Sequence, residues 1–268
     1  MKREGSEMSP SRVTKLKVRE LGKHFVVDGK EHRVLAGVDF AVGYRELVCI
    51  VGPSGTGKST LLRAIAGLTA ASEGSVELDG HRVAGPPPNT AVVFQDYNRS
   101  LMPWLRVEAN VRLPLKGKGI PREQQDARVE RALRDVGLSE ASHRFPWQLS
   151  GGMQQRVSIA RALAFEPQFL LMDEPFASVD AQTRSDLEDL VLKIRDERDV
   201  TILLVTHDID ESVYLSDRVV VLGERPARVV DIIDVPLPTP RNQHDTKADP
   251  AFAKLRTCVL ERVQAPPS

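Results

Sequence analysis

The segment Gly52-Pro-Ser-Gly-Thr-Gly57-Lys58-Ser59 decides how the rest of the chain is interpreted. It has the spacing G-x-x-x-x-G-K-[ST], follows the apolar run Leu47 to Val51, and precedes residues 61–68, whose apolar side chains recur at helical spacing. A strand, a glycine-rich loop and a helix in this order are the context that a phosphate-binding loop requires. A glycine turn that only caps a helix would not explain the whole pattern.

The residue types in this loop suit the phosphates of a nucleotide. Glycines let backbone N–H groups close around phosphate oxygens, and the N-terminus of the following helix adds a favourable dipole. Lys58 is expected to reach the β and γ phosphates, and the Ser59 hydroxyl is expected to bind Mg²⁺. We expect nucleotide contacts along the whole loop, from Gly52, Pro53, Ser54, Gly55, Thr56, Gly57, Lys58, Ser59 and Thr60. Kinases, GTPases and transport motors all remain open at this point.

Composition narrows the class of protein. Lys plus Arg and Asp plus Glu balance at 37 each, so no overall field attracts nucleic acid or anionic lipid. No apolar run approaches the roughly 18 to 20 residues of a membrane helix. The polar segment 1–10 does not resemble a secretory signal and is expected to be disordered. Cys49 and Cys258 have neither disulfide nor metal-site spacing, so we expect reduced thiols, with Cys49 in the core.

The remaining patterns predict an α/β fold. Apolar segments of strand length alternate with helical patterns after residue 168, as in a parallel sheet. A stretch rich in helical spacing and prolines interrupts this order and predicts a mainly helical insert. We expect one nucleotide-binding domain at 11–235, its insert at about 96–148, and a tail at 236–268 with a short helix from Pro250 to Val263.

A carboxylate pair follows the apolar segment Phe169 to Met172. Asp173 and Glu174 would then stand at the C-terminal edge of the sheet, where sites of α/β proteins lie. Asp173 is expected to hold Mg²⁺, and Glu174 to orient or deprotonate an attacking water. An acidic pair in a solvated loop is the alternative, and the phosphate loop upstream argues against it.

The string Leu149-Ser-Gly-Gly-Met-Gln-Gln155 is the most specific in the chain. Ser150 suits a helix N-cap, and the two glycines allow close approach of the backbone to an anion. With this string the sequence closely resembles the nucleotide-binding subunits of ATP-binding cassette (ABC) transporters. The resemblance implies ATP as the nucleotide and an ABC ATPase domain at 11–235, in which a parallel-sheet core carries an antiparallel β subdomain and the helical insert. It also implies that Ser150, Gly151 and Gly152 contact ATP held by a second copy of the chain, in a head-to-tail homodimer.

The resemblance extends from about Leu16 to Leu222 and implies further roles. Gln95 matches a glutamine that contacts Mg²⁺ and the attacking water, and His207 matches a histidine that contacts the γ phosphate. Asp180 matches the aspartate of the loop after the catalytic glutamate, where this chain has Ser-Val-Asp in place of the commoner Ala-Leu-Asp. Phe25 stands where the family places an aromatic ring on adenine, although a core role remains open.

Several strings are similar to the nitrate, sulfonate and taurine importer group, including Met102-Pro-Trp-Leu105 and Val205-Thr-His-Asp-Ile-Asp-Glu211. The resemblance implies import of a small anion through separate membrane-spanning permease subunits, at the cytoplasmic face of the bacterial inner membrane, with a solute-binding protein as an indirect partner. We expect Trp104 either to contact the permease or to be core of the insert.

Two rival functions fit the sequence less well. A soluble ABC ATPase acting on nucleic acid or the ribosome would usually carry two cassettes or a long coiled coil, and this chain has one signature string and no sustained heptads. We therefore expect no nucleic-acid partner. A small-molecule kinase would leave Leu149 to Gln155 unexplained.

Overall fold

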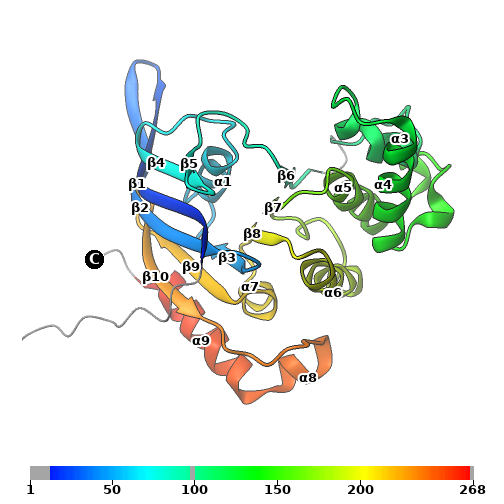
Figure 1. Ribbon diagram of the computed structural model, residues 1–268. Helices are drawn as coiled ribbons and strands as arrows, with labels where there is room; N and C mark the ends of the chain where they lie inside the picture. The colour runs from blue at the N-terminus through cyan, green and yellow to red at the C-terminus, as the bar shows by residue number, and fades with distance from the viewer. Residues whose placement is uncertain (1–12, 97–99, 266–268) are drawn as a thin grey trace, which may run out of the picture.

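A six-stranded sheet forms the centre of the computed structural model, which describes residues 13–96 and 100–265 (Figure 1). Its strand order is β10-β9-β3-β8-β7-β6. Neighbouring strands from β9 to β6 run parallel, and β10 pairs antiparallel with β9 at one edge. The strands are β3 (Leu47–Val51), β6 (Thr90–Val93), β7 (Phe169–Asp173), β8 (Thr201–Val205), β9 (Arg218–Gly223) and β10 (Arg228–Asp234).

A four-stranded antiparallel sheet of order β2-β1-β4-β5 packs beside it. Its strands are β1 (Thr14–Val27), β2 (Lys30–Gly43), β4 (Glu73–Leu78) and β5 (His81–Arg82). The β1 strand extends to Val27, because its backbone stays paired with β2 to its last residue. The two sheets confirm the α/β class and the antiparallel subdomain.

Two hydrophobic cores cover opposite faces of the six-stranded sheet, because successive side chains of a strand point to opposite sides. Val48 and Ile50 of β3 pack with Leu61 and other residues of α1 (Lys58–Ile65). Cys49, a free thiol as expected, packs on the other face with residues of α5 (Gly151–Ala164) and α6 (Ala181–Arg198). The helices α1 and α5 therefore lie on opposite sides of the sheet.

Short helices occupy most of the segment expected to form the insert. They are α3 (Val107–Arg112), η1 (Leu113–Leu115), α4 (Arg122–Asp135), η2 (Ser139–Ala141) and η3 (Pro146–Gln148). Both α3 and α4 pack against α5, and Figure 1 shows this group to one side of the strands, beyond β6 and β7.

The chain then returns to the central sheet and ends in a helical tail. After α7 (Ile209–Leu215), the tail forms α8 (Gln243–Ala248) and α9 (Pro250–Gln264), and α9 packs against α7, β9 and β10. The segment 1–10, expected to be disordered, lies outside the described residues. Within residues 13–96 and 100–265, no helix is both long and apolar enough to span a bilayer.

Candidate active site

The glycine-rich loop connects the fully buried strand β3 to α1. Gly57, the N-cap residue of α1, has a φ of 103°, in the left-handed region that suits glycine. A Cβ atom at this position would lie 2.8 Å from Val34 Cγ1, so packing also requires glycine here. The Thr56 hydroxyl donates to the Pro53 carbonyl and closes the turn. The backbone N–H groups at the N-terminus of α1 are therefore accessible to a ligand, because the glycine at the N-cap has no side chain to cover them.

Lys58 folds back onto this loop. Its Nζ atom donates to the carbonyl oxygens of Gly52 and Pro53, at 2.8 and 3.1 Å. Burial lowers the pKa of Lys58 from its ordinary value, and the carboxylates of Glu174 and Asp173 oppose that shift. The ammonium group is thus a nearly buried cation at the loop, available to exchange carbonyl oxygens for phosphate oxygens.

Ser59 and Asp173 meet between α1 and the end of β7. The Ser59 hydroxyl donates to Asp173 Oδ1 at 3.0 Å. Burial raises the pKa of Asp173, while the hydrogen bond from Ser59 acts in the opposite direction. A hydroxyl and a carboxylate in contact form an oxygen donor set of the kind that Mg²⁺ prefers. The sequence predicts that both residues hold Mg²⁺, and this contact brings their oxygen atoms together.

Glu174, the residue after β7, contacts two other predicted catalytic side chains, Gln95 and His207. Its Oε2 atom accepts from Gln95 Nε2 at 3.2 Å and lies 3.0 Å from His207 Nδ1. The backbone of Glu174 has a φ of 44°, which is uncommon for a residue with a side chain. Gln95 follows β6 and His207 follows β8, so the ends of three parallel strands bring this group together.

Asp208, Arg184 and Glu211 surround the His207 loop, and sequence reasoning did not identify them as site residues. Asp208 caps α7 by accepting from the Glu211 backbone N–H at 3.1 Å, and Arg184 Nη1 donates to the other Asp208 oxygen at 3.1 Å. The spacing Asp-x-x-Glu is a helix-capping signal in the sequence. Nothing in that signal predicts that the Glu211 side chain is only 4% exposed.

The signature residues lie apart from this group. Ser150 caps α5 by accepting from the Met153 N–H at 3.3 Å, and α5 lies across the sheet from α1. A Cβ on Gly152 would lie 2.2 Å from Thr183 Cγ2, so α5 approaches the start of α6 closely. Asp180 caps α6 through Thr183. Among the described residues, no hydrogen bond joins Ser150, Gly151 or Asp180 to the phosphate loop.

Phe25 lies near the tip of the β1–β2 hairpin with its ring 39% exposed. It pairs with His32, and Val34, two residues further along β2, contacts the position of Gly57. This end of the hairpin therefore lies beside the phosphate loop. The Lys23 ammonium stands 4.9 Å from the centre of the Phe25 ring. The exposed ring is not core, which favours the adenine-stacking interpretation.

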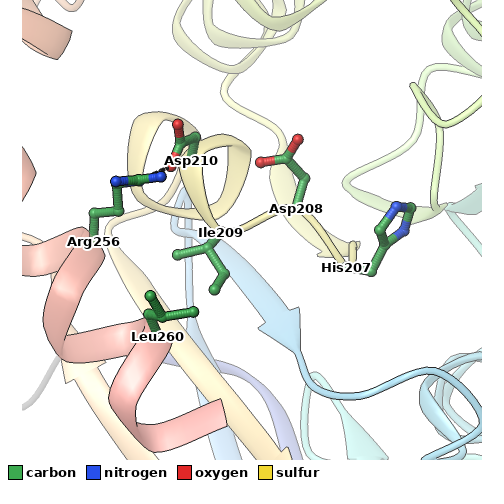
Figure 2. Close-up of a pocket in the computed structure, with 6 residues that line it drawn as sticks. All are labelled: His207, Asp208, Ile209, Asp210, Arg256 and Leu260. Atoms are coloured by element: carbon green, nitrogen blue, oxygen red, sulfur yellow. Dashed lines mark hydrogen bonds and ion pairs between the residues drawn. The ribbon is translucent and has the colours of Figure 1, made fainter. Parts of the chain in front are cut away.

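A pocket of about 390 Å³ opens beside His207, between α7 and α9. Figure 2 shows Arg256 and Leu260 of α9 reaching toward Asp210 and Ile209, with the His207 ring at the opposite end. Arg256 forms an ion pair with Asp210. The pocket thus adjoins the site through His207, while its other wall belongs to the tail.

The chain matches a known protein family over the segment that contains most of these site residues. The family model described as "ABC transporter" matches residues 35–177, which contain the phosphate loop, the signature string and Asp173 with Glu174. The chain belongs to the ABC transporter family. It is an ATP-binding subunit of that family, and such subunits are ATPases coupled to transport.

Relatives of this ABC subunit are named as transport proteins. It is 48% identical to an uncharacterised ABC transporter ATP-binding protein of Methanocaldococcus jannaschii, over 85% of each chain. It is 41% identical to the nitrate transport protein NasD of Klebsiella oxytoca, over 91% of this chain and 94% of the relative. The bicarbonate transport ATP-binding protein CmpC of Synechococcus elongatus is 42% identical over 91% of this chain, which spans only 37% of that longer protein.

Solved structures share the ABC fold across most of the chain. The cbiO1 protein of Clostridium perfringens, part of an ABC transporter complex, gives a TM-score of 0.77 at 27% identity, over 95% of this chain and 96% of that one. An ATP-binding cassette solved as a dimer bound to ADP and Pi gives a TM-score of 0.71 at 30% identity, over 82% of this chain and 98% of that one.

Proposed function

We propose that this ABC ATPase powers the import of a small anionic solute, such as nitrate, a sulfonate or taurine, through separate permease subunits. The observation that carries the ATPase part is the convergence of Lys58, Asp173 and Glu174 at the phosphate loop. The solute class is supported by relatives named for nitrate and bicarbonate, which are both small monoanions. A role on nucleic acid or the ribosome is not favoured by these names.

The site residues have separate roles in this proposal. Residues 52–60 bind the phosphates through backbone N–H groups, and Lys58 neutralises charge on the transferred phosphate. Ser59, Asp173 and Gln95 would hold Mg²⁺, and the Ser59–Asp173 contact fits this role. Bound Mg²⁺ would offset negative charge on the phosphates. Glu174 orients the attacking water and accepts its proton, and His207, which contacts Glu174, binds the γ phosphate.

A second copy of the chain completes the site. The N-terminus of α5, with Ser150 at its cap, offers a positive dipole end that meets no phosphate loop within its own chain. In a head-to-tail homodimer, Ser150, Gly151 and Gly152 would contact the ATP of the other copy. Asp180 lies in the same region through Thr183 and Gly152. The dimeric cassette with ADP and Pi supports this arrangement.

The helices around α3 offer a surface for the permease. Trp104 is 70% exposed, so the alternative that it is core of the insert does not hold. Trp147, also 70% exposed, stacks on Phe145 just before the signature string. Large exposed aromatic side chains are typical of protein interfaces. With such a permease the subunit would lie peripherally on the cytoplasmic face of the inner membrane, and a solute-binding protein would act indirectly.

Reconstitution tests the function. The subunit is purified together with its permease partner, and placed in liposomes with the matching solute-binding protein. We expect ATP-dependent uptake of nitrate, bicarbonate or taurine, whose sulfonate group is anionic, and no uptake with Lys58→Ala. Stable association with ribosomes or nucleic acid, with no permease and no anion uptake, would replace this proposal by the rival function.

A further inference from the structure

A cavity of about 20 Å³ adjoins the catalytic side chains Glu174 and His207, which both line it. Arg184 and Glu211 also line this cavity. A buried water needs roughly 10 to 15 Å³ of such volume and two or more polar partners. The cavity therefore has room for one water molecule and is too small for any larger ligand.

Two polar atoms of the lining residues are buried without a partner. They are Arg184 Nε, which can only donate, and Glu211 Oε1. Buried polar groups in proteins are nearly always hydrogen-bonded, to the protein or to ordered water. A water that accepts from Arg184 Nε and donates to Glu211 Oε1 would satisfy both atoms. Its second hydrogen would remain for Glu174 or His207, which line the same cavity.

We propose that Arg184 and Glu211 hold one ordered water behind Glu174 and His207, and that together they act as positioning residues for the His207 loop during ATP hydrolysis. The inference rests on the proposed function for its link to hydrolysis, whereas the water site itself depends only on the fold.

The hydrogen bonds of the His207 loop explain how Arg184 and Glu211 position His207 without touching its ring. The His207 side chain is 55% exposed, and within the described part of the chain its ring is bonded to Glu174. Both sequence neighbours of His207 are anchored to the proposed site. Thr206 Oγ1 accepts from the Asp208 N–H at 2.9 Å, and Arg184 binds the Asp208 carboxylate. The position of His207 is therefore set through its flanking residues, which Arg184 and Glu211 fix.

The charges around Glu211 give the site a pH dependence. Burial raises the pKa of Glu211 well above its usual range, and the carboxylates of Glu188 and Asp208 add to this effect. Thr206 and Arg184 oppose the shift, and Glu174 and His207 face the same cavity. Glu211 is thus neutral below its raised pKa and becomes a carboxylate as the pH rises through it. That added negative charge would repel Asp208 and Glu174 and loosen the loop.

Substitutions at Arg184 separate the water from the ion pair. Arg184→Lys keeps a cation for Asp208 but lacks the Nε–H donor, because the two side chains differ in donor geometry. We expect Arg184→Lys and Arg184→Gln both to lower kcat by roughly 10- to 100-fold, with KM for ATP little changed. Arg195→Gln, on the same helix but remote from the cavity, is the matched control and should retain kcat. Full activity in Arg184→Lys would show that the ion pair suffices and that no water is needed.

Substitutions at Glu211 test the pH dependence. Glu211→Gln keeps the shape of the neutral acid, so kcat near neutral pH should stay within about threefold of wild type, and the alkaline loss of activity should disappear. Glu211→Leu removes both oxygens and should lower kcat as Arg184→Gln does. Glu188→Gln, at a similarly buried residue bound to Gln243 and Lys247, should keep the alkaline loss but move it to lower pH, because the Glu188 carboxylate helps to raise the pKa of Glu211. An unchanged pH profile in Glu211→Gln would overturn the role of Glu211.

A crystal structure of the full chain tests the water without turnover. We expect density for one water bonded to Arg184 Nε and Glu211 Oε1, and its loss in Arg184→Lys. Direct bonding of either atom to protein, with no water, would overturn the site even in an active enzyme. If the wild type did not hydrolyse ATP, the proposed function would fail while the density still decided the water site.

Discussion

Replacing Glu174 by glutamine separates ATP binding from hydrolysis. The amide keeps an oxygen that can accept from Gln95 Nε2, as Glu174 Oε2 does at 3.2 Å, and it fits the same 18% exposed position. What it loses is the charge and the ability to take a proton. Removal of a positioned general base lowers turnover by about 10² to 10⁴, which is about 2.7 to 5.4 kcal/mol in the transition state.

The same change should stabilise the ATP-bound dimer. Two unit charges about 4 Å apart near a protein surface repel by roughly 4 kcal/mol, so removing the Glu174 charge beside the γ phosphate relieves repulsion of that order. That energy corresponds to a change of about 10³ in an equilibrium constant. We therefore expect Glu174→Gln to elute as a dimer with Mg-ATP in size-exclusion chromatography, and as a monomer without it.

Glu166→Gln is the matched control for this experiment. Glu166 also has a positive φ, of 53°, and it stands before β7 where Glu174 stands after it. Its side chain pairs with Arg128 at 2.9 Å, away from the phosphate loop. The Glu166→Gln variant should hydrolyse ATP normally and form no lasting dimer. Normal hydrolysis by Glu174→Gln as well would refute the reasoning and make His207 the next candidate for activating the water.

Four further results are expected. Lys58→Ala should abolish ATP turnover in a phosphate-release assay, because a cation at the transferred phosphate contributes several kcal/mol to transition-state stabilisation; near-normal turnover would exclude the assigned role. Gly152→Ala should destabilise the fold by about 1 to 3 kcal/mol, since its Cβ would lie 2.2 Å from Thr183, and thermal melting measures this. A crosslinker at position 151 should reach ATP bound by the other copy; labelling only within one copy would contradict the homodimer. Trp104→Glu should detach the subunit from the permease or uncouple ATP hydrolysis from transport, and leave basal ATPase activity intact; full transport would place the permease contact elsewhere.

The sequence predicted best those strands whose residues are all buried. The strands β3, β7 and β8 are buried along their full length, so their apolar runs are continuous and identify them. The strand β1 is harder to delimit from sequence. Its register against β2 shifts between Val18 and His24, which breaks the alternation of apolar and polar residues, and its last residues, Phe25 to Val27, are apolar but exposed.

The site was predictable where a motif is local and not where it depends on tertiary packing. Lys58 and Ser59 follow from one string, and the contact of Ser59 with Asp173 follows from the usual topology of parallel strands. The pairing of Arg184 with Asp208 joins residues of different helices and has no signature in sequence. Burial of Glu211 likewise depends on α6 and on the loop before α7, since an isolated glutamate on a short helix would be expected in solvent.

The left-handed backbone at Glu174 has a consequence for engineering this protein. A residue with a side chain in that conformation costs about 1 to 2 kcal/mol relative to the ordinary helical region, and glycine avoids most of that penalty. A library selected only for thermal resistance would therefore enrich glycine at position 174, and its best survivors would be inactive. Screens for a more thermostable enzyme need to measure turnover at every round, because at this position thermal stability and activity favour different residues.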